Sequence, residues 1–326
     1  MTLDFHHNTG ILGQIIHLNC MNKKKILVLG ANGMLGKMVS LYLKDNEDLD
    51  VKVTSRTKNT FLDNFFKDST LDFEITEEYK NTFNKLVTNN DFDFVINCIG
   101  VIKPKIDEDN NESILRTIMI NSYFPLDLQK ICFENSIKYY QIGTDCVYSG
   151  KIGNYDEFSY QDAEDVYGKS KVVGEIQGEQ KHVIRSSIIG PETGKGFSLL
   201  NWFLNNKNET VSGFKNHLWN GVTTLNFARV LEGIIKNEEL NFKVQHLIPS
   251  NTITKAKLLE EFKKCFNKNI DIEHIDAQTV VDRTLLTKNE ELNKQLWLMA
   301  GYEKIPTVEE NVLELANSKF TEMILD

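Results

Sequence analysis

A glycine-rich turn near the N-terminus limits the folds open to this chain more than any other feature. The turn spans residues 30–36 (GANGMLG), follows a short apolar run over residues 25–29, and opens a helix-spaced segment over residues 35–44. A strand, a glycine turn and a helix in this order form a phosphate-binding unit, because the helix N-terminus offers free N–H groups and a positive dipole end to an anion. The predicted dinucleotide contacts in this unit are Gly30, Asn32, Gly33, Met34, Leu35 and Gly36.

The three glycines of the turn have different predicted roles. Gly30 permits the tight turn, Gly33 lets the backbone approach a pyrophosphate, and Gly36 allows the helix to pack closely on the strand. Three glycines at this spacing are a weak signal by themselves and a stronger one between a buried strand and a helix. The sequence around the turn supplies both elements.

Segments of strand and helix character alternate from this turn to about residue 190. Short apolar runs predict strands over residues 51–55, 71–75, 92–97, 137–143 and 182–186. Helices are predicted over residues 77–89, over 111–134 with a kink or break at Pro125, and around Tyr167. This alternation predicts an α/β fold, a Rossmann-type doubly wound parallel sheet with helices on both faces.

The end of the second predicted strand bears on the choice of dinucleotide. An acidic residue there binds the ribose 2′-hydroxyl of NAD, whereas an arginine accommodates the 2′-phosphate of NADP. The chain has no acid at residues 54–56 and places Arg56 there, which favours NADP(H) over NAD(H). Ligands of such sheets bind at the carboxyl ends of the strands. The further predicted cofactor contacts are Ser55, Arg56, Asp72, Phe73, Cys98, Ile99 and Gly100.

The chain beyond Gly190 and Pro191 shows weaker alternation. Helices are predicted over residues 199–205 and 255–266, and a strand over residues 244–248. We therefore expect an NADP-binding Rossmann domain over residues 21–190. Residues 191–326 are expected to form mainly a smaller C-terminal substrate-binding domain, with some elements returning to the Rossmann sheet.

A tyrosine and a lysine four residues apart supply the predicted chemistry. Tyr167 and Lys171 stand on one face of a predicted helix, about one turn apart. A free tyrosine has a pKa of roughly 10. A neighbouring ammonium group favours the phenolate and is expected to move that pKa toward neutrality. Tyr167 is therefore a predicted acid–base group, and both residues are predicted to contact the cofactor.

Composition and charge exclude several classes of function. The chain has 41% apolar and 25% charged residues, as an ordinary soluble protein has, and a formal net charge of −9. General nucleic-acid binding needs a basic face, so we expect no nucleic-acid partner. The five cysteines are scattered without a C-x-x-C pair, which indicates reduced thiols in a cytoplasmic protein and no metal site.

The first twenty residues differ from the rest of the chain. They lack a basic n-region, and polar residues interrupt their apolar run, so they are neither a signal peptide nor a membrane span. We expect residues 1–20 to be a disordered extension, because Met21 would make a natural start for the folded protein.

These motifs, with Thr144-Asp145, residues 167–171 (YGKSK) and residues 185–187 (RSS), resemble those of the extended short-chain dehydrogenase/reductases. Within that family the chain looks most like the dTDP-4-dehydrorhamnose reductase group. The resemblance implies that Thr144 hydrogen-bonds a substrate carbonyl, Tyr167 donates a proton, and Lys171 binds the nicotinamide ribose. It also implies that Asn121 supports the active site, and that the reaction is reduction of a 4-keto group on a nucleotide-linked 6-deoxysugar.

Two other activities remain open, and a third is disfavoured. Sugar-nucleotide dehydratases of this build have a glutamate after the Thr-Asp pair, but this chain has Cys146, which argues against dehydration. An epimerase that retains its NAD shares the Thr-Tyr-Lys set, and Arg56 favours an exchanging NADPH instead. Some proteins of this build are dinucleotide-binding regulatory subunits, such as that of methionine adenosyltransferase, and the full triad argues against that role.

The substrate side is less defined by the sequence. The expected substrate is a nucleotide sugar used in surface-polysaccharide or deoxysugar biosynthesis, and the sugar, the base and the C4 stereochemistry stay open. No membrane partner is expected, and a homodimer is a candidate assembly. Aromatic and basic residues after residue 190, including Phe214, His217 and Trp219, are candidates for lining a pocket. The predicted substrate contacts are Lys103, Asp145, Phe197, Trp202 and Arg283.

Overall fold

Seven parallel strands form the central sheet of the computed structural model, in the order β11-β6-β5-β4-β1-β2-β3. The structure describes residues 23–57, 59–175, 182–194, 196–237, 240 and 242–326. The expected extension over residues 1–20 lies outside these residues. The strands are β1 (Lys24–Leu29), β2 (Leu49–Ser55), β3 (Thr70–Asp72), β4 (Phe94–Asn97), β5 (Lys138–Thr144), β6 (His182–Ser186) and β11 (Val244–His246). The predicted parallel α/β sheet is confirmed.

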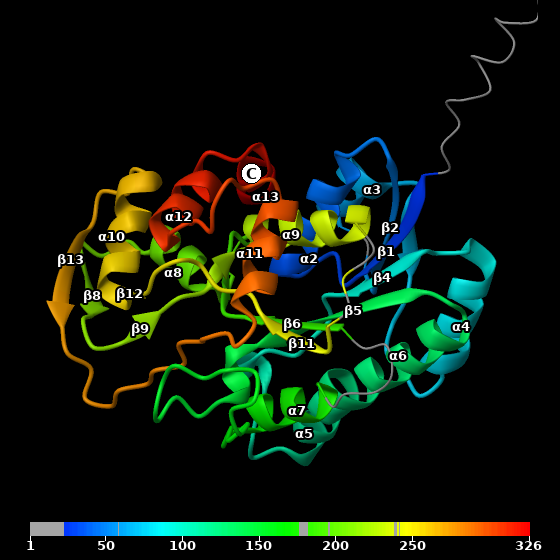
Figure 1. Cartoon of the computed structure of the whole chain (residues 1–326), viewed down its shortest axis with the longest axis horizontal. Coiled ribbons are helices and arrows are strands. Elements are labelled where there is room, and N and C mark those ends of the chain that lie inside the picture. The colour runs from blue at the N-terminus through cyan, green and yellow to red at the C-terminus, as the bar shows by residue number, and fades with distance from the viewer. Residues whose placement is uncertain (1–22, 58, 176–181, 195, 238–239, 241) are drawn as a thin grey trace, which may run out of the picture.

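Helices cover both faces of this sheet (Figure 1). The side chains of β1 explain why both faces need cover. Ile26 and Val28 enter one apolar core, whereas Leu27 and Leu29 enter another on the opposite face. Successive side chains of a strand point to opposite faces, so a continuous apolar run needs cover on both. The first core is closed by α2 (Met34–Lys44), α3 (Thr60–Phe66), α9 (Thr224–Asn237) and α11 (Glu290–Met299), and the second by α4 (Tyr79–Asn90) and α6 (Phe124–Glu134).

The predicted helix over residues 111–134 is helical along its whole length but changes its hydrogen-bond pattern in the middle. It consists of α5 (Asn111–Ile118), a π-helical segment (Met119–Tyr123) and α6, whose first turn contains Pro125. Proline has no N–H to donate within a helix, so a change of hydrogen-bond pattern beside it is expected. The backbone stays helical on both sides of Pro125, and the irregularity there is the π-helical segment directly before it, not a break.

The chain after residue 190 contributes to two regions. Strand β11 pairs with β6 at the edge of the central sheet, and α9 packs against α2. The remaining elements lie together beside the sheet (Figure 1): α8 (Leu199–Asn205), β8 (Thr210–Phe214), β9 (Leu218–Trp219), β12 (Ile253–Thr254), α10 (Lys255–Cys265), β13 (Asp271–Ile275) and α12 (Val308–Ala316). The domain boundary at residue 190 stays a prediction.

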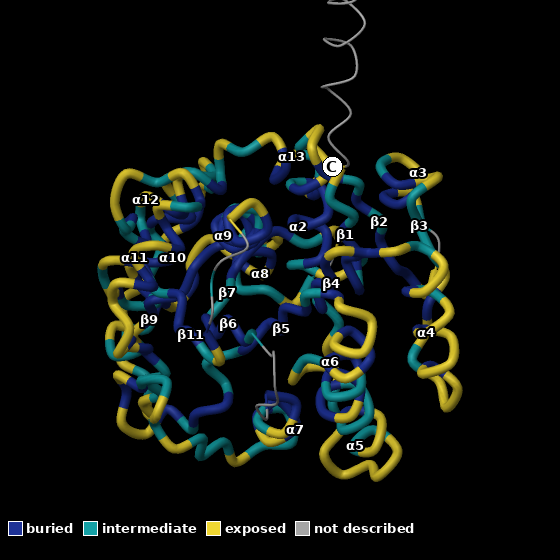
Figure 2. The backbone as a smooth tube through the Cα atoms, turned by 45° about the vertical axis from the view of Figure 1, so that its right-hand side comes forward, coloured by how far each residue is buried: buried dark blue, intermediate teal, exposed yellow. Residues whose placement is uncertain are grey.

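Three short strand pairs hold this second region in place. Strand β13 pairs in parallel with β8, β12 pairs antiparallel with β9, and β10 (Val222–Thr223) pairs with β7 (Ile188–Ile189). The C-terminal helix α13 (Lys319–Leu325) returns to α2. Figure 2 shows the sheet as largely buried and the outer turns of α4 and α5 as exposed. Within the described ranges, no helix has the length and apolarity that a membrane crossing requires.

Candidate active site

The glycine turn after β1 has the steric properties of a dinucleotide-binding loop. A Cβ at Gly36 would lie 2.1 Å from the carbonyl oxygen of Gly30, so α2 approaches the turn too closely for any side chain. Gly30 itself has a φ of +81°, which only glycine adopts without strain. A Cβ at Gly33 would have only the Gly30 oxygen nearby, at 3.5 Å, so its space is open to a ligand.

The first turn of α2 carries the positive end of the helix dipole without a competing acid. Its N-cap is Gly33, no side chain caps the helix, and no acidic residue stands in the first turn. Lys37, one turn further, is buried and donates a hydrogen bond to Thr193. A pyrophosphate fits such a helix N-terminus, because its N–H groups have no side-chain acceptor of their own.

The predicted contacts at the ends of β2 and β3 have different surroundings. The Asn32 amide donates to the Ser55 hydroxyl at 2.5 Å and so ties the glycine turn to β2. Arg56 is exposed, and its guanidinium has no ion pair among the described residues. Asp72 is exposed at the end of β3. Phe73 packs in the core against Phe83 and Phe124, so its side chain fills the core at this point.

The segment after β4 is fixed by the side chain of Asn121. Its amide oxygen accepts from the N–H of Val101 at 2.8 Å, and its amide nitrogen donates to the Val101 carbonyl at 2.9 Å and to the Ser170 hydroxyl at 3.0 Å. The predicted supporting role of Asn121 therefore has a concrete form here: it joins the loop after Cys98-Ile99-Gly100 to the helix that carries Tyr167.

That helix, α7 (Val166–Gly174), lies unusually close to its neighbours. A Cβ at Gly174 would be 2.0 Å from the backbone oxygen of Asn121, and one at Gly168 would be 2.4 Å from that of Cys146. The two glycines thus let α7 pack against the π-helical segment and against the turn that follows β5. Neither glycine was assigned a packing role from the sequence, although Gly168 lies within the Tyr-x-x-x-Lys motif and Gly174 follows it by three residues.

This packing places Thr144 beside Tyr167, in the turn where β5 ends. The Thr144 hydroxyl donates to the Asp145 carboxylate at 3.2 Å, and the Lys171 ammonium donates to the Ile142 carbonyl at 3.2 Å. Burial raises the pKa of the Tyr167 phenol well above its usual range, and the neighbouring Thr144 hydroxyl opposes that shift. The expected lowering of the Tyr167 pKa is therefore not found. A protonated phenol is the form that can donate a proton.

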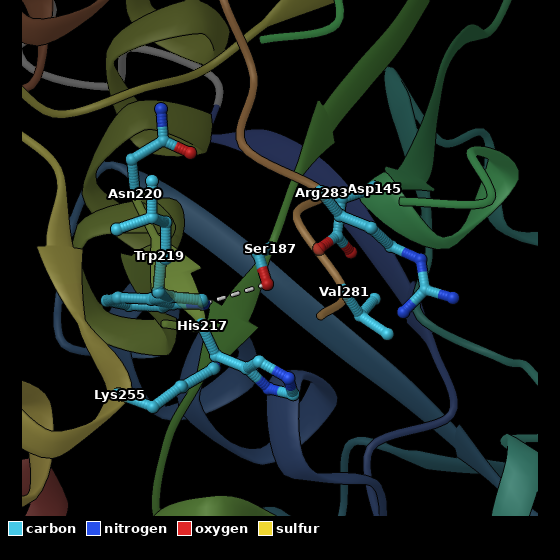
Figure 3. A pocket seen from close by; sticks show the side chains of 9 residues that line it. Asp145, Ser187, His217, Trp219, Asn220, Lys255, Val281 and Arg283 are labelled. Atoms are coloured by element: carbon cyan, nitrogen blue, oxygen red, sulfur yellow. Dashed lines mark hydrogen bonds between the residues drawn. The ribbon is translucent and has the colours of Figure 1, made fainter. Parts of the chain in front are cut away.

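A cavity of about 300 Å³ opens beside Thr144 and Tyr167, and Asp145 links the cavity to these residues. The Asp145 carboxylate accepts from the Thr144 hydroxyl at 3.2 Å and also lines the cavity. In Figure 3, Asp145 and Arg283 lie across the cavity from Trp219 and Lys255. The lining residues are Asp145, Ser187, His217, Leu218, Trp219, Asn220, Lys255, Val281 and Arg283.

Lys255 is a cavity residue that no sequence motif singles out. Its ammonium lies 5.2 Å from the centre of the Trp219 ring, and burial lowers its pKa to about 8, opposed by Asp145. The antiparallel pairing of β12 with β9 places it there, since Thr254 lies opposite Leu218. Only a long-range strand pairing could have revealed this neighbour.

The predicted substrate contacts divide into two groups. Asp145 and Arg283 line the cavity, as do His217 and Trp219 from the wider candidate set. Lys103 instead forms an ion pair at 2.8 Å with Asp165, the N-cap of α7. The exposed side chains of Phe197 and Trp202 are outside the cavity lining.

Comparison with known proteins identifies the family. The model of the RmlD substrate binding domain matches residues 24–320, nearly the whole described chain. The chain belongs to this family. The sequence-based assignment to the extended short-chain dehydrogenase/reductases, and within them to oxidoreductases like dTDP-4-dehydrorhamnose reductase, is thereby confirmed at the level of family and fold.

Individual members and neighbours of the RmlD substrate binding domain family agree with this assignment. A probable low-salt glycan biosynthesis reductase, Agl14 of Haloferax volcanii, is 30% identical over 149 residues, which are 45% of this chain and 46% of that protein. The match thus spans about half of either chain. The family is one of sugar-nucleotide reductases and epimerases, which confirms the predicted function at this coarser level.

Solved structures show the same fold at low identity. The dTDP-4-dehydrorhamnose reductase of Bacillus anthracis, solved with NADP, has a TM-score of 0.69 at 16% identity and covers 90% of this chain and 98% of its own. A UDP-glucose 4-epimerase of Thermotoga maritima, solved with UDP-glucose, also has a TM-score of 0.69, at 17% identity, covering 90% and 97%. Reductases and epimerases of this build therefore share one backbone.

Proposed function

We propose that this protein is an NADPH-dependent reductase of the 4-keto group of a nucleotide-linked 4-keto-6-deoxysugar. One observation carries the proposal: Asp145 both accepts a hydrogen bond from Thr144, beside the Tyr167 phenol, and lines a cavity that contains Lys255 and Arg283. A proton donor and a cationic pocket are therefore contiguous. A sugar nucleotide needs that combination, since its ketone must reach the donor while its diphosphate remains in the pocket.

The dinucleotide would be held by the glycine turn and by Lys171. The open space at Gly33 and the uncapped start of α2 fit its pyrophosphate, and the Lys171 amine fits the nicotinamide ribose. When bound there, NADPH supplies a hydride. The exposed Arg56 at the end of β2 fits a 2′-phosphate, which supports NADPH over NADH.

The protein's own groups would supply the proton and the orientation. The Thr144 hydroxyl has a single proton, which it donates to the Asp145 carboxylate in the structure; it would turn this proton to the substrate carbonyl oxygen and so fix that oxygen beside Tyr167. The phenol, held protonated by burial, gives its proton to that oxygen as the ketone becomes an alcohol. The resulting phenolate then regains a proton from water, which restores the site.

The cavity would recognise the anionic part of the substrate. Lys255 and Arg283 are cations in its wall, and Trp219 presents an aromatic surface. A volume of about 300 Å³ accommodates a sugar or a diphosphate and leaves the base to the cavity mouth. The Trp219 indole is itself fixed, because its N–H donates to the Ser187 hydroxyl at 2.9 Å (Figure 3).

A screen of NADPH oxidation with a panel of nucleotide-linked 4-keto-6-deoxysugars tests the proposal. We expect turnover with at least one member and none when Tyr167→Phe replaces the parent protein. An epimerase would instead purify with NAD that survives dialysis and would isomerise a sugar nucleotide without net oxidation. A regulatory subunit would show no turnover with any sugar, and Tyr167→Phe would leave its partner binding unchanged.

A further inference from the structure

Glu175, directly after α7, is a buried carboxylate next to the catalytic group. Its side chain is only 1% exposed. One carboxylate oxygen accepts from the backbone N–H of Thr144 at 3.2 Å, and the other accepts from Arg185 Nε at 3.1 Å and from a second guanidinium nitrogen at 2.7 Å. A single side chain thus connects α7 to the last residue of β5 and to β6.

Arg185 is held on its far side as well. It donates hydrogen bonds to the Tyr148 hydroxyl and to Nε2 of His246, both at 2.8 Å. Nδ1 of His246 lies 2.7 Å from the Leu286 carbonyl, which can only accept, so Nδ1 carries the proton and Nε2 accepts from Arg185. Burial and the Arg185 charge lower the pKa of His246 to about 4, so the imidazole stays neutral.

Because the Tyr148 and His246 partners of Arg185 are neutral, the carboxylate of Glu175 is the hydrogen-bond partner that carries a charge opposite to that of Arg185. The titratable groups that face Arg185 are Glu175, Tyr148, Glu157 and the neutral His246. Burial alone would lower the pKa of the guanidinium, but its anionic neighbours, Glu175 foremost, raise it. Hydrogen bonds with charged partners in such a buried setting have strict geometry, and removing one partner leaves the other uncompensated. The carboxylate is therefore held in one position.

Glu175 also stands four residues after Lys171, and its backbone N–H donates to the Lys171 carbonyl at 2.9 Å, so the two side chains leave one face of the helix. Burial lowers the pKa of the Lys171 amine, and Glu175 is the largest influence in the opposite direction. The other titratable groups that face this amine are the thiols of Cys98 and Cys146, from the segments after β4 and β5. Burial raises the pKa of both thiols to about 12, so neither carries a charge at neutral pH.

We propose that Glu175 is a positioning residue, which holds the backbone of Thr144 beside Tyr167 and keeps the Lys171 amine cationic, with Arg185 as its clamp. The proposal rests on the reductase function argued above, because it assigns Thr144 and Lys171 to that reaction. A merely structural ion pair would stabilise the fold and leave the titration of Lys171 unchanged. The titration of Lys171 therefore distinguishes a positioning role of Glu175 from a merely structural one.

Two substitutions separate the effect of the Glu175 charge from the effect of its side-chain length. Glu175→Gln keeps a hydrogen-bonding group of the same length and removes the charge. Glu175→Asp keeps the charge and shortens the side chain by one methylene, which withdraws it from the Thr144 N–H. Lysine labelled with ¹³C at Cε reports the titration of Lys171 by NMR, with Lys171→Arg to assign its signal, and turnover is measured in parallel.

We expect Glu175→Gln to lower the pH at which Lys171 titrates by about one unit or more. Glu175→Asp should leave that titration near the parent value and lower kcat by roughly tenfold to a hundredfold with little change in KM, because Thr144 is displaced.

An unchanged Lys171 titration in Glu175→Gln overturns the role of the charge. Parent-like kcat in Glu175→Asp overturns the role in positioning, including when Glu175→Gln fails to fold. A parent protein that turns over no sugar defeats the proposed function, while the NMR titration still decides whether Glu175 sets the charge of Lys171.

Discussion

The cofactor side and the substrate side of this site are built in different ways. The cofactor side consists of two contiguous motifs, the glycine turn and the Tyr-x-x-x-Lys helix, whose close packing is enforced by glycines such as Gly36 and Gly168. The cavity draws its wall from five separate segments, represented by Asp145, Ser187, Trp219, Lys255 and Arg283. The first is fixed by local backbone sterics, and the second by strand pairings between distant parts of the chain.

This difference predicts how each side responds to mutation. Substitutions in the glycine turn or in the Tyr167–Lys171 helix should act through backbone geometry or through one reacting atom, with large effects, whereas an exposed cofactor contact such as Arg56 should have a small one. Substitutions in the cavity should act through charge and binding, with smaller and pH-dependent effects. Four experiments test the contrast, from the largest expected effect to the smallest.

The largest effect is expected for Tyr167→Phe, which removes one oxygen and keeps the ring. Loss of a general acid typically lowers the rate by about a hundredfold to ten-thousandfold. Dinucleotide affinity and thermal stability should change little, because the ring still fills its place in α7. Steady-state kinetics, with calorimetry of dinucleotide binding as the control, measures both. Near-parent turnover in this variant would assign the proton donor elsewhere.

A pair of glycine substitutions separates packing from ligand approach. Gly36→Ala must displace the Gly30 carbonyl, 2.1 Å from the new Cβ, and should destabilise the fold by about 1–3 kcal/mol. Gly33→Ala meets only an ordinary contact at 3.5 Å, so the melting temperature should stay near that of the parent while dinucleotide affinity falls. Thermal denaturation and binding calorimetry of both variants measure the contrast. Equal destabilisation by the two substitutions would contradict it.

The cavity should show its contribution as a pH dependence of KM. Burial lowers the pKa of Lys255 to about 8, so its cationic form dominates below that pH and the neutral form above it. KM for an anionic sugar nucleotide should therefore rise above about pH 8, by up to about tenfold per pH unit. Lys255→Arg is the matched control, because its guanidinium stays charged and should remove the rise. A rise of the same size in Lys255→Arg would mean that another group titrates.

The smallest effect is expected for Arg56→Ala. Arg56 is exposed, and contacts between exposed charges are typically worth about 0.2–1 kcal/mol, which corresponds to at most about a fivefold change in affinity. NADPH binding should weaken while NADH binding stays the same. Calorimetry with both dinucleotides measures this, and equal affinities for NADPH and NADH in the parent protein would exclude the proposed preference.

Much of the fold could be predicted because its signals are local. The runs that became β1, β2, β4, β5 and β6 are short, apolar and bounded by turn residues, so each indicates a buried strand by itself. Helices α9, α11, α12 and α13 were not predicted. Their signals were present, such as the capping box of Thr307 and Glu310 at the start of α12. They were missed because strand and helix segments alternate less regularly after residue 190.

The sequence by itself determined the glycine turn, the Tyr167–Lys171 pair and the family, because these features depend on the order and spacing of neighbouring residues. Only the tertiary structure decided that Lys255 faces Asp145 across a cavity, that Phe73 belongs to the core, and that Glu175 reaches Thr144 and Arg185. It also reversed the expected direction of the Tyr167 pKa. The physical reason is that burial and electrostatic environment are set by the groups that surround a side chain, and at this site most of those groups come from segments distant in the sequence.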